Sequence, residues 1–379
     1  MNMKAKATIL IVDDEEDIRL NLRDCAELEG YQVLEAGNGQ EALDCVQSQS
    51  PQIVISDLMM PIMDGMQLLE EIEKRQIEIP VVVMTAFGTI EYAVNAMKRG
   101  AADFITKPID LDYMMRVIRR VLKTSELERK VKEQQRQINE DLNLAASIQR
   151  CMLPQPVDTP ELSLNFYFQP LVGIGGDYLT VHQFNSKKIA VAVYDVCGHG
   201  VSAALIANVV HNQMQMRLAE DRPPANAVDL LNRFITKNIA QTGMFITVVV
   251  AVIDMEDGFL TAFNAGHPEI LVWKNETKSL ETISSHVMPV GFKANILADE
   301  SEAKVPLSSG DRILMYTDGF PETRNAEGVM LGLQGVKKIV ETHIPKNSTD
   351  LLDAISTELK ACRKGDPDDD YTLVIVDIK

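Results

Sequence analysis

The first part of the chain alternates short apolar runs with longer amphipathic segments. In one of the longer segments, Ile18, Leu22, Cys25 and Leu28 recur at three- and four-residue spacing before a glycine, as in a helix with one buried face. A regular β/α alternation predicts an α/β domain with a doubly wound parallel sheet. The runs that predict strands are residues 7–12, 32–36, 53–56, 80–85 and 103–106.

The pattern changes to that of a single polar helix over residues 123–153. This segment contains neither glycine nor proline, which favours one continuous helix. Gln134 and Asp141 weaken its heptad seam, so two interpretations stay open: a solvated single helix, or the parallel homodimeric coiled coil that we favour because so polar a helix is marginal alone. The seam positions are Leu127, Val131, Gln134, Ile138, Asp141, Ala145, Ile148 and Met152.

Strands and helices cluster in the rest of the chain instead of alternating. Strand-like runs such as "KIAVAVYDV" and "MFITVVVAVIDM" dominate its front and middle, and helix-like stretches such as "TDLLDAISTELKACR" lie between or after them. Clustering of this kind predicts an α+β layered β-sandwich flanked by helices. The chain is therefore predicted to consist of a domain at 1–122, a helical coiled-coil linker at 123–153 and a second domain at 154–379.

Composition narrows the class of protein. With 379 residues, 46% of them hydrophobic, the chain is long enough for more than one core. A net charge of −18 argues against a nucleic-acid partner, because binding to phosphates relies on lysine and arginine. The five cysteines are scattered without CxxC spacing, and neither a signal peptide nor an apolar run of ~18 residues is present. We expect a cytoplasmic protein without a membrane partner.

Polar residues follow the predicted strands of the first domain. Asp13 and Asp14 come after the first strand, Asp57 after the third, Thr85 after the fourth and Lys107 after the fifth. Carboxyl ends of parallel strands meet at one edge of a sheet, so these residues should converge. Any single acid could merely cap a helix, but three carboxylates in one pocket repel each other unless a hard cation such as Mg²⁺ binds. A carboxylate beside such a cation could attack a phosphoryl group.

The motifs "VDDEEDI", "DLMMPIMDG", "MTAFG" and "DFITKP" resemble the receiver domain of two-component response regulators. The resemblance implies that Asp57 accepts phosphate from a histidine kinase, with Lys107 beside it. It also implies that Thr85 and Phe104 form the conformational switch. The implied Mg²⁺ ligands are Asp13, Asp14, Asp57 and the carbonyl of Met59.

Acids also end strands in the second domain: Asp177 in "GIGGDY", Asp195 in "AVYDVCGHG", Asp318 in "MYTDGF" and Asp369 in "DPDDDYTLVIV". If the four converge, they need cations between them, and two metals bridged by a water would serve. Such a centre generates a hydroxide nucleophile near neutral pH and allows phosphoester hydrolysis without a covalent protein intermediate. No lipase-like GxSxG elbow or phosphate-binding GxxxxGK[ST] loop points to other chemistry.

The motifs "GGDY", "DVCGHGVSAAL", "FNAGHPEILVW", "PVGF", "YTDGFPETRN" and "DDDYTLVIV" resemble the bacterial sporulation and stress-response branch of the PPM (2C-type) serine/threonine phosphatases. Two Mn²⁺ or Mg²⁺ ions are implied by this resemblance. Asp195 would bridge them, Asp370 would compete with Asp369 for the last ligand position, and His199 would act either as a general acid or as a hydrogen-bonding residue of the turn. The implied ligands are Asp177, Asp195, the carbonyl of Val196, Asp318, and Asp369 or Asp370.

Together the two resemblances predict a response regulator whose phosphorylation on Asp57 controls a metal-dependent protein serine/threonine phosphatase. The implied substrate is a phosphorylated anti-sigma-factor antagonist in a partner-switching pathway. Two rivals are a phosphorylation-gated adaptor that binds such a protein without turnover, and a DNA-binding regulator, which the acidic charge and the lack of a helix-turn-helix pattern disfavour.

Overall fold

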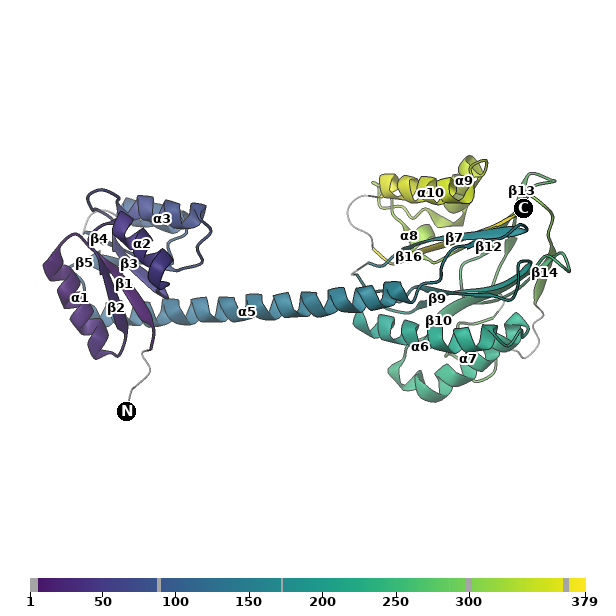
Figure 1. Ribbon diagram of the computed structural model, residues 1–379, viewed down its shortest axis with the longest axis horizontal. Coiled ribbons are helices and arrows are strands. Elements are labelled where there is room, and N and C mark those ends of the chain that lie inside the picture. The colour runs from purple at the N-terminus through teal and green to yellow at the C-terminus, as the bar shows by residue number, and fades with distance from the viewer. Residues whose placement is uncertain (1–5, 87–89, 172, 286, 297–301, 364–367) are drawn as a thin grey trace. The chain divides into compact units, whose positions relative to one another are not determined.

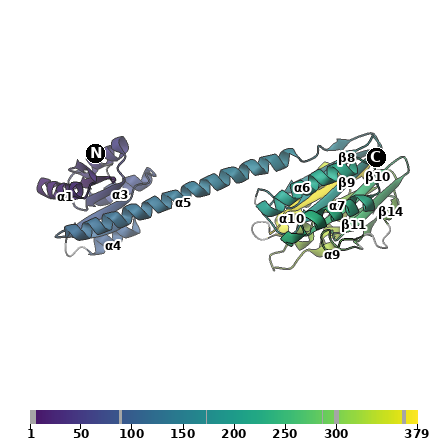
Figure 2. The ribbon, with the colours of Figure 1, turned by 90° about the horizontal axis from the view of Figure 1, so that it is seen from below.

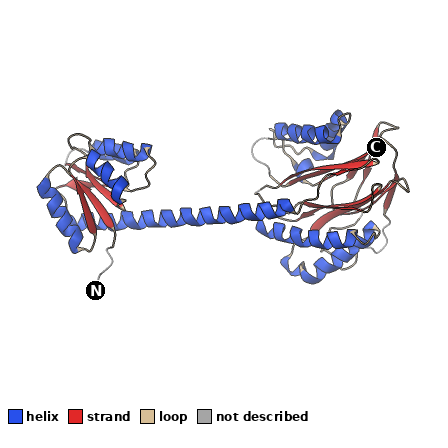
Figure 3. Cartoon of the chain, viewed as in Figure 1, coloured by secondary structure: helices blue, strands red, loops and turns tan. Residues whose placement is uncertain are grey.

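The computed structural model describes residues 6–86, 90–171, 173–285, 287–296, 302–363 and 368–379. The chain forms two compact units, Met1–Ile138 and Asn139–Lys379, and their division falls inside one long helix, α5 (Figure 3). The domain boundaries expected at residues 122 and 153 stay predictions.

The first unit contains a five-stranded parallel sheet in the order β2-β1-β3-β4-β5 (Figure 1). The α/β prediction is confirmed, and each strand lies within about one residue of its expected range. The strands are β1 (Thr8–Val12), β2 (Gln32–Ala36), β3 (Ile53–Asp57), β4 (Val81–Ala86) and β5 (Asp103–Lys107). The helices are α1 (Glu16–Leu28), α2 (Gly39–Gln49), α3 (Gly65–Lys74), α4 (Ile90–Lys98) and α5 (Leu111–Cys151).

Helices cover both faces of this sheet. On one face, Ile9 and Ile11 of β1 pack in a core with Leu22 of α1 and Ile118 of α5. On the other face, the core contains residues of α2, α3 and α4. Because both faces are buried, the central strands are almost entirely apolar, and polar side chains collect at the strand ends.

The continuous helix expected between the domains is present, but it begins earlier than the sequence pattern indicated. α5 starts at Leu111, inside the first unit, and runs to Cys151. Its first turns pack on the sheet through Met114 and Ile118, which are fully buried. The last helix of the first unit and the linker are thus one element.

The second unit is built from two antiparallel sheets, ordered β14-β11-β10-β9-β8 and β13-β12-β15-β16-β7-β6. The first sheet contains β8 (Tyr178–Gln183), β9 (Lys188–Val196), β10 (Ile246–Asp254), β11 (Phe259–Ala265) and β14 (Ala303–Pro306). The second contains β6 (Val157–Asp158), β7 (Leu162–Gln169), β12 (Ile270–Lys274), β13 (Ser279–Ile283), β15 (Arg312–Tyr316) and β16 (Tyr371–Ile378).

The two sheets pack face to face, and helices cover their outer faces, as the layered sandwich prediction required. Val191 of β9 and Val374 of β16 belong to the core between the sheets. α6 (Val201–Leu218) and α7 (Pro224–Asn238) cover the first sheet (Figure 2). α9 (Gly332–His343) and α10 (Ser348–Cys362) cover the second, and the short elements η1 (Ala240–Thr242) and α8 (Gly319–Glu322) complete the unit.

No helix in the described part of the chain is long and apolar enough to cross a membrane.

Candidate functional site

The receiver acids converge at the carboxyl edge of the parallel sheet, as the strand order requires. Asp13 follows β1 and is fully buried, Asp57 ends β3 and is buried, and Asp14 is exposed. One ligand oxygen from each of the three lies within 4.8 Å of the others, a spacing that one hard cation can span.

Lys107 closes this cluster from the end of β5. Its ammonium donates to Asp13 Oδ2 at 2.8 Å and to Asp57 Oδ2 at 2.7 Å. Burial acts to lower the pKa of Lys107, but the two carboxylates outweigh burial and raise it. The lysine therefore keeps a positive charge beside Asp57, where it can offset the charge of a transferred phosphoryl group.

Thr85 and Phe104 lie on neighbouring strands. β4 pairs with β5 in a register that places Val83 opposite Phe104 and Thr85 opposite Thr106, so Thr85 and Phe104 project from the same face of the sheet. Thr85 is buried at the strand end. Met59 is largely exposed, and its N–H donates to Asp57 Oδ1 at 3.5 Å. The roles that the receiver resemblance implied for these residues stay predictions.

Gly65 explains why a glycine closes the motif "DLMMPIMDG". Asp64 caps α3 by accepting from the N–H of Gln67 at 2.8 Å, which fixes where the helix starts. A Cβ on Gly65 would lie 2.2 Å from the carbonyl oxygen of Asp57. The helix can therefore begin this close to Asp57 only with glycine at its first position.

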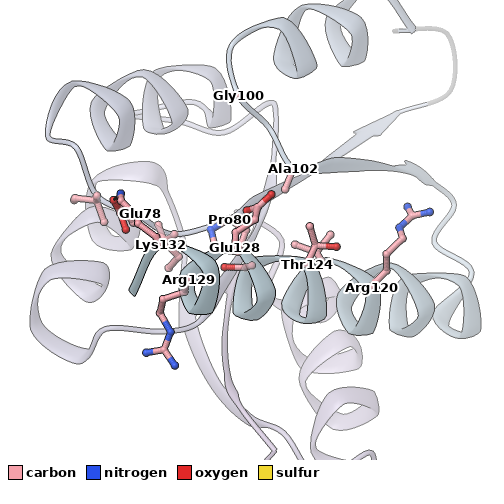
Figure 4. A pocket seen from close by; sticks show the side chains of 13 residues that line it. Glu78, Pro80, Gly100, Ala102, Arg120, Thr124, Glu128, Arg129 and Lys132 are labelled. Atoms are coloured by element: carbon pink, nitrogen blue, oxygen red, sulfur yellow. Dashed lines mark hydrogen bonds and ion pairs between the residues drawn. The ribbon is translucent and has the colours of Figure 1, made fainter. Parts of the chain in front are cut away.

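A cavity of about 570 Å³ lies elsewhere in the first unit (Figure 4). Pro80 and Ala102, next to the amino ends of β4 and β5, line one side, and Arg120, Glu128 and Lys132 of α5 line the other. The ammonium of Lys132 is paired with the carboxylate of Glu78 across it. Both members of that pair are well exposed, so its contribution to stability is small.

The acids of the second unit come from both sheets and lie close enough to affect each other's ionisation. Asp177 precedes β8, Asp195 lies in β9, Asp318 follows β15, and Asp369 precedes β16. Asp177 is fully buried; its Oδ2 accepts from the hydroxyl of Thr317 at 2.5 Å. The four acids selected from the sequence therefore belong to one electrostatic cluster.

Burial and mutual repulsion disfavour the ionised form of these acids. Burial, together with the charges of Asp195 and Asp370, raises the pKa of Asp177 well above its usual range. For Asp195, burial and the charges of Asp318, Asp369 and Asp370 raise the pKa to about 8, although a hydrogen bond with Asp177 acts in the opposite direction. Like charges this close disfavour ionisation of both acids, and a cation bound between them would stabilise their charged forms.

The outer part of the cluster is more open to solvent. Burial, followed by the charges of Asp369 and Glu322, raises the pKa of Asp318 to about 6. Burial also raises the pKa of Asp369, and the charge of His199 acts to lower it. His199 is exposed at the turn that precedes α6. The imidazole is thus solvent-accessible, and its charge is close enough to influence Asp369.

Asp370 is a poor candidate for a metal ligand, because backbone N–H groups already occupy both of its carboxylate oxygens. Its Oδ1 accepts from the N–H of Leu171 at 2.6 Å, and its Oδ2 accepts from the N–H groups of Gly176 at 2.7 Å and Asp177 at 3.4 Å. Three backbone donors satisfy this buried carboxylate without a cation. Asp370 therefore ties the segment before β8 to the start of β16, and Asp369 is the better candidate ligand.

Glycines allow close approach between the motifs around the cluster. A Cβ on Gly175 would lie 2.3 Å from Asp370 Oδ2, and one on Gly176 would lie 2.7 Å from the carbonyl oxygen of Val196. A Cβ on Gly319 would lie 2.1 Å from the carbonyl oxygen of Asp370. Two of the motifs, "GGDY" and "YTDGF", thus place glycines where the backbone or a carboxylate of another motif passes.

The donor set of the cluster suits divalent cations. Buried carboxylates with raised pKa values are stabilised by cations, and oxygen donors suit Mg²⁺ and Mn²⁺. Across the described residues, only the receiver acids bring three ligand atoms within 4.8 Å of one another. The described acids of the second unit do not meet this spacing, so they are spread more widely than those of the first unit.

The end of α5 contacts the first of these motifs. Gln149 is 2% exposed; its amide donates to the carbonyl oxygen of Gly175 at 2.9 Å and accepts from the Gly175 N–H at 3.2 Å. The hydroxyl of Tyr178 donates to the carbonyl oxygen of Gln149 at 2.6 Å. Ala146 packs against Ile174 and Ala204. The last turns of the helix are therefore fastened to the loop that carries Asp177.

Sequence reasoning missed Thr317 and Gln149. Thr317 is a hydroxyl residue before an acid, and Gln149 is one glutamine among many polar residues of a helix. Both patterns are common in any sequence, and only the fold shows the partners of these two residues. His267, considered above only as part of the motif "FNAGHPEILVW", is a core residue: its Nδ1 lies 2.9 Å from the hydroxyl of Thr247, and burial lowers its pKa to about 3.

Comparison with known proteins assigns the first unit to the receiver domains. The response regulator receiver domain model matches residues 9–119. Sporulation initiation phosphotransferase F of Bacillus subtilis is 36% identical over 114 residues, which are 30% of this chain and 92% of that protein. The regulatory protein AtoC of Escherichia coli is 36% identical over 130 residues, which are 34% of this chain; the match spans only 28% of AtoC.

The second unit has the fold of PP2C-type phosphatases. The SiaA-PP2C domain of Pseudomonas aeruginosa superposes with a TM-score of 0.57 at 17% identity, over 65% of this chain and 98% of that domain. The RsbU and RsbW domains of Rv1364c from Mycobacterium tuberculosis superpose with a TM-score of 0.50 at 22% identity, over 59% of this chain and 61% of that one. At these identities the likeness establishes the fold alone.

Fold and site together define a receiver domain fused to a PP2C-type phosphatase domain. The family model described as stage II sporulation protein E (SpoIIE) matches residues 185–379, more than half of the chain. The chain belongs to the stage II sporulation protein E family. The matched residues include Asp195, Asp318 and Asp369, whereas Asp177 lies before them.

Proposed function

We propose that this protein is a response regulator in which phosphorylation of Asp57 controls a metal-dependent protein serine/threonine phosphatase. The observation that carries the phosphatase half is the cluster of one buried and three partly buried acids, from four motifs, whose charges raise each other's pKa values. Such a cluster costs free energy unless cations bind, and a phosphoester hydrolase uses cations at this place.

The proposed ligands are Asp195 as the shared one, the carbonyl of Val196, and Asp177, Asp318 and Asp369. When bound, two Mn²⁺ or Mg²⁺ ions supply the charge that activates water and offsets the negative phosphoryl oxygens. His199 is the proposed general acid, because it is exposed beside Asp369 and can donate a proton to the leaving serine oxygen. Asp370 and Thr317 hold Asp177 in place.

In the receiver, we propose that a histidine kinase is the phosphodonor and that Asp57 is the acceptor. Mg²⁺ would be held by Asp13, Asp14, Asp57 and the carbonyl of Met59. Lys107 already contacts Asp57 at 2.7 Å, and it would contact a phosphoryl oxygen in the phosphorylated state. Thr85 and Phe104 would then change position and alter the receiver surface.

The proposed substrate is a phosphoserine or phosphothreonine protein, an anti-sigma-factor antagonist in a partner-switching pathway. The experiment measures phosphate release from a phosphoserine peptide by the full chain in Mn²⁺. We expect phosphate release from the phosphoserine peptide, and we expect EDTA to abolish it. A phosphotyrosine peptide of the same sequence should release no phosphate. If every metal tested gives no release while the chain still binds the phosphopeptide, the protein is the adaptor instead.

We also propose that the chain is a parallel homodimer through α5. Large apolar side chains at the heptad positions are solvent-exposed: Leu127 by 54%, Val131 by 64%, Ile138 by 52% and Ile148 by 53%. An isolated helix gains nothing from exposed apolar residues at this spacing, whereas a second copy would bury them. A change in pairing could carry the receiver's state along the helix to Gln149, which contacts the loop before Asp177.

The double substitution Leu127→Lys and Val131→Lys is expected to weaken dimerisation at least ~tenfold, because it buries like charges in the seam. Leu144→Lys is the matched control, since Leu144 is also apolar and exposed but lies outside the seam. Sedimentation equilibrium of the full chain provides the measurement. A wild-type chain that stays monomeric, or equal effects of the seam and control variants, would refute the dimer.

A further inference from the structure

A second cavity, of about 230 Å³, is lined by residues close in sequence to two acids of the phosphatase site. The hydroxyls of Thr323 and Tyr371 are 3.0 Å apart at one side of it. Thr323 follows α8, which begins one residue after Asp318, and Tyr371 begins β16, two residues after Asp369. The segments that carry two proposed metal ligands therefore also build this cavity. Its lining includes Thr323, Arg324, Asn325, Arg363, Asp368 and Tyr371.

Two arginines, Arg324 and Arg363, line the cavity, together with one acidic residue, Asp368. Arg324 Nη1 donates to the carbonyl oxygen of Gly328 at 3.1 Å, and Arg324 also forms a backbone bridge with Met330. Asn325 Oδ1 accepts from the N–H groups of Glu327 and Val329, which orders the turn between them. The turn thus holds Arg324 at the cavity, and Arg363 at the end of α10 lines it as well.

The size and charge of the cavity restrict what it can bind. Pockets for small-molecule ligands usually measure about 300 to 1,000 Å³, so this one suits a single side chain. The planar donor forks of arginine match the oxygens of carboxylate and phosphate groups. The remaining carboxylate in the lining, Asp368, offsets one of the two positive charges, which favours one anionic group over an extended polyanion.

We propose that this cavity binds an anionic side chain of the substrate protein, an aspartate or glutamate carboxylate or a second phosphate, close to the phosphorylated residue. The inference rests on the proposed phosphatase function and adds a specificity determinant to it. Because Arg324 and Arg363 line this cavity and are not among the proposed metal ligands, they select the substrate sequence and take no part in bond cleavage.

The test measures binding and turnover separately, with three fluorescent peptides. One has aspartate on both sides of the phosphoserine, one has asparagine at the same positions, and one has a second phosphoserine as neighbour. For binding, the central phosphoserine is replaced by its phosphonate analogue, so that anisotropy with the full chain does not depend on turnover. Wild type is expected to bind one or both anionic peptides about tenfold more tightly than the asparagine peptide.

Arg324→Gln and Arg363→Gln should each reduce this preference, and Arg324→Lys should keep part of it because the charge remains. Arg222→Gln, at an exposed arginine between α6 and α7, should keep all of it. With hydrolysable peptides the arginine variants should raise KM for anionic peptides and leave kcat unchanged. The identity of the preferred peptide shows whether the ligand is a carboxylate or a phosphate.

Equal affinity of wild type for all three peptides would overturn the proposal. A preference that persists in the Arg324→Gln Arg363→Gln double variant would overturn it as well. Absence of phosphate release from every peptide would contradict the phosphatase function alone, since the anisotropy measurement still decides whether the cavity selects anionic neighbours.

Discussion

Replacing Asp195 by asparagine is expected to reduce Mn²⁺-dependent phosphate release by at least ~10³-fold, while the protein stays folded. Asp195 is the proposed shared ligand of both cations. Without it the cations no longer stabilise the charge of the transition state, and the activation free energy rises by several kcal/mol. Asparagine has the same shape, so β9 and its pairing with β10 should persist. Phosphate release from a phosphoserine peptide and circular dichroism of the same samples test both parts.

The same variant should be more stable than wild type without metal above pH 7, because one charge leaves a cluster in which like charges repel. Asp353→Asn, on α10 and outside the cluster, serves as the control that changes neither property. An Asp195→Asn protein with near wild-type turnover would remove Asp195 from the metal site.

Metal should stabilise the second unit most at alkaline pH. The pKa values of Asp318 and Asp195 are raised to about 6 and about 8 in the fold, against ~3.9 in an unfolded chain. From pH ~4 to ~8 the folded state therefore binds more protons than the unfolded state, and stability falls as pH rises. Without metal, the melting temperature of this unit should drop by about 5 to 10 °C between pH 5 and pH 8.5.

Thermal denaturation with EDTA or with millimolar Mn²⁺, at several pH values, provides the measurement. Mn²⁺ should raise the melting temperature by more at pH 8.5 than at pH 5, because ligands must be deprotonated to bind. Asp195→Asn should flatten the pH dependence in EDTA. A melting temperature without metal that rises from pH 5 to pH 8.5 would contradict the arrangement of acids described above.

The receiver half was the more predictable part, for a physical reason. In a parallel sheet the residues that follow each strand must share one edge, so strand boundaries alone bring Asp13, Asp57 and Lys107 together. The apolar runs that define those boundaries are buried on both faces and are therefore distinct in the sequence.

In the phosphatase half, the candidate acids could be selected from the sequence, but the residues that hold them in place could not. Asp177, Asp195, Asp318 and Asp369 stand out because each ends or begins an apolar strand. The choice between Asp369 and Asp370 could not be made from two adjacent acids; it depends on three backbone N–H groups that only the folded chain brings to Asp370. Separations of up to 199 residues between donor and acceptor leave no local signal.

The helix α5 was likewise predictable only in part. Its continuity followed from the absence of glycine and proline, yet its start at Leu111 did not, because the receiver's last helix passes into the linker without a break in composition. Gln149 lies among other polar residues of the helix, and its burial arises from the second unit's fold.

The most direct test of the central claim is the effect of the receiver's state on phosphatase turnover. Phosphate release from a phosphoserine peptide is measured in Mn²⁺ and Mg²⁺ with and without beryllofluoride, for wild type and for Asp57→Asn. Beryllofluoride is expected to change wild-type turnover at least ~fivefold and to leave Asp57→Asn unaffected, as coupling energies of 1–3 kcal/mol allow. Equal turnover of wild type in both states, with Asp57 shown to bind beryllofluoride, would contradict control of the phosphatase by the receiver.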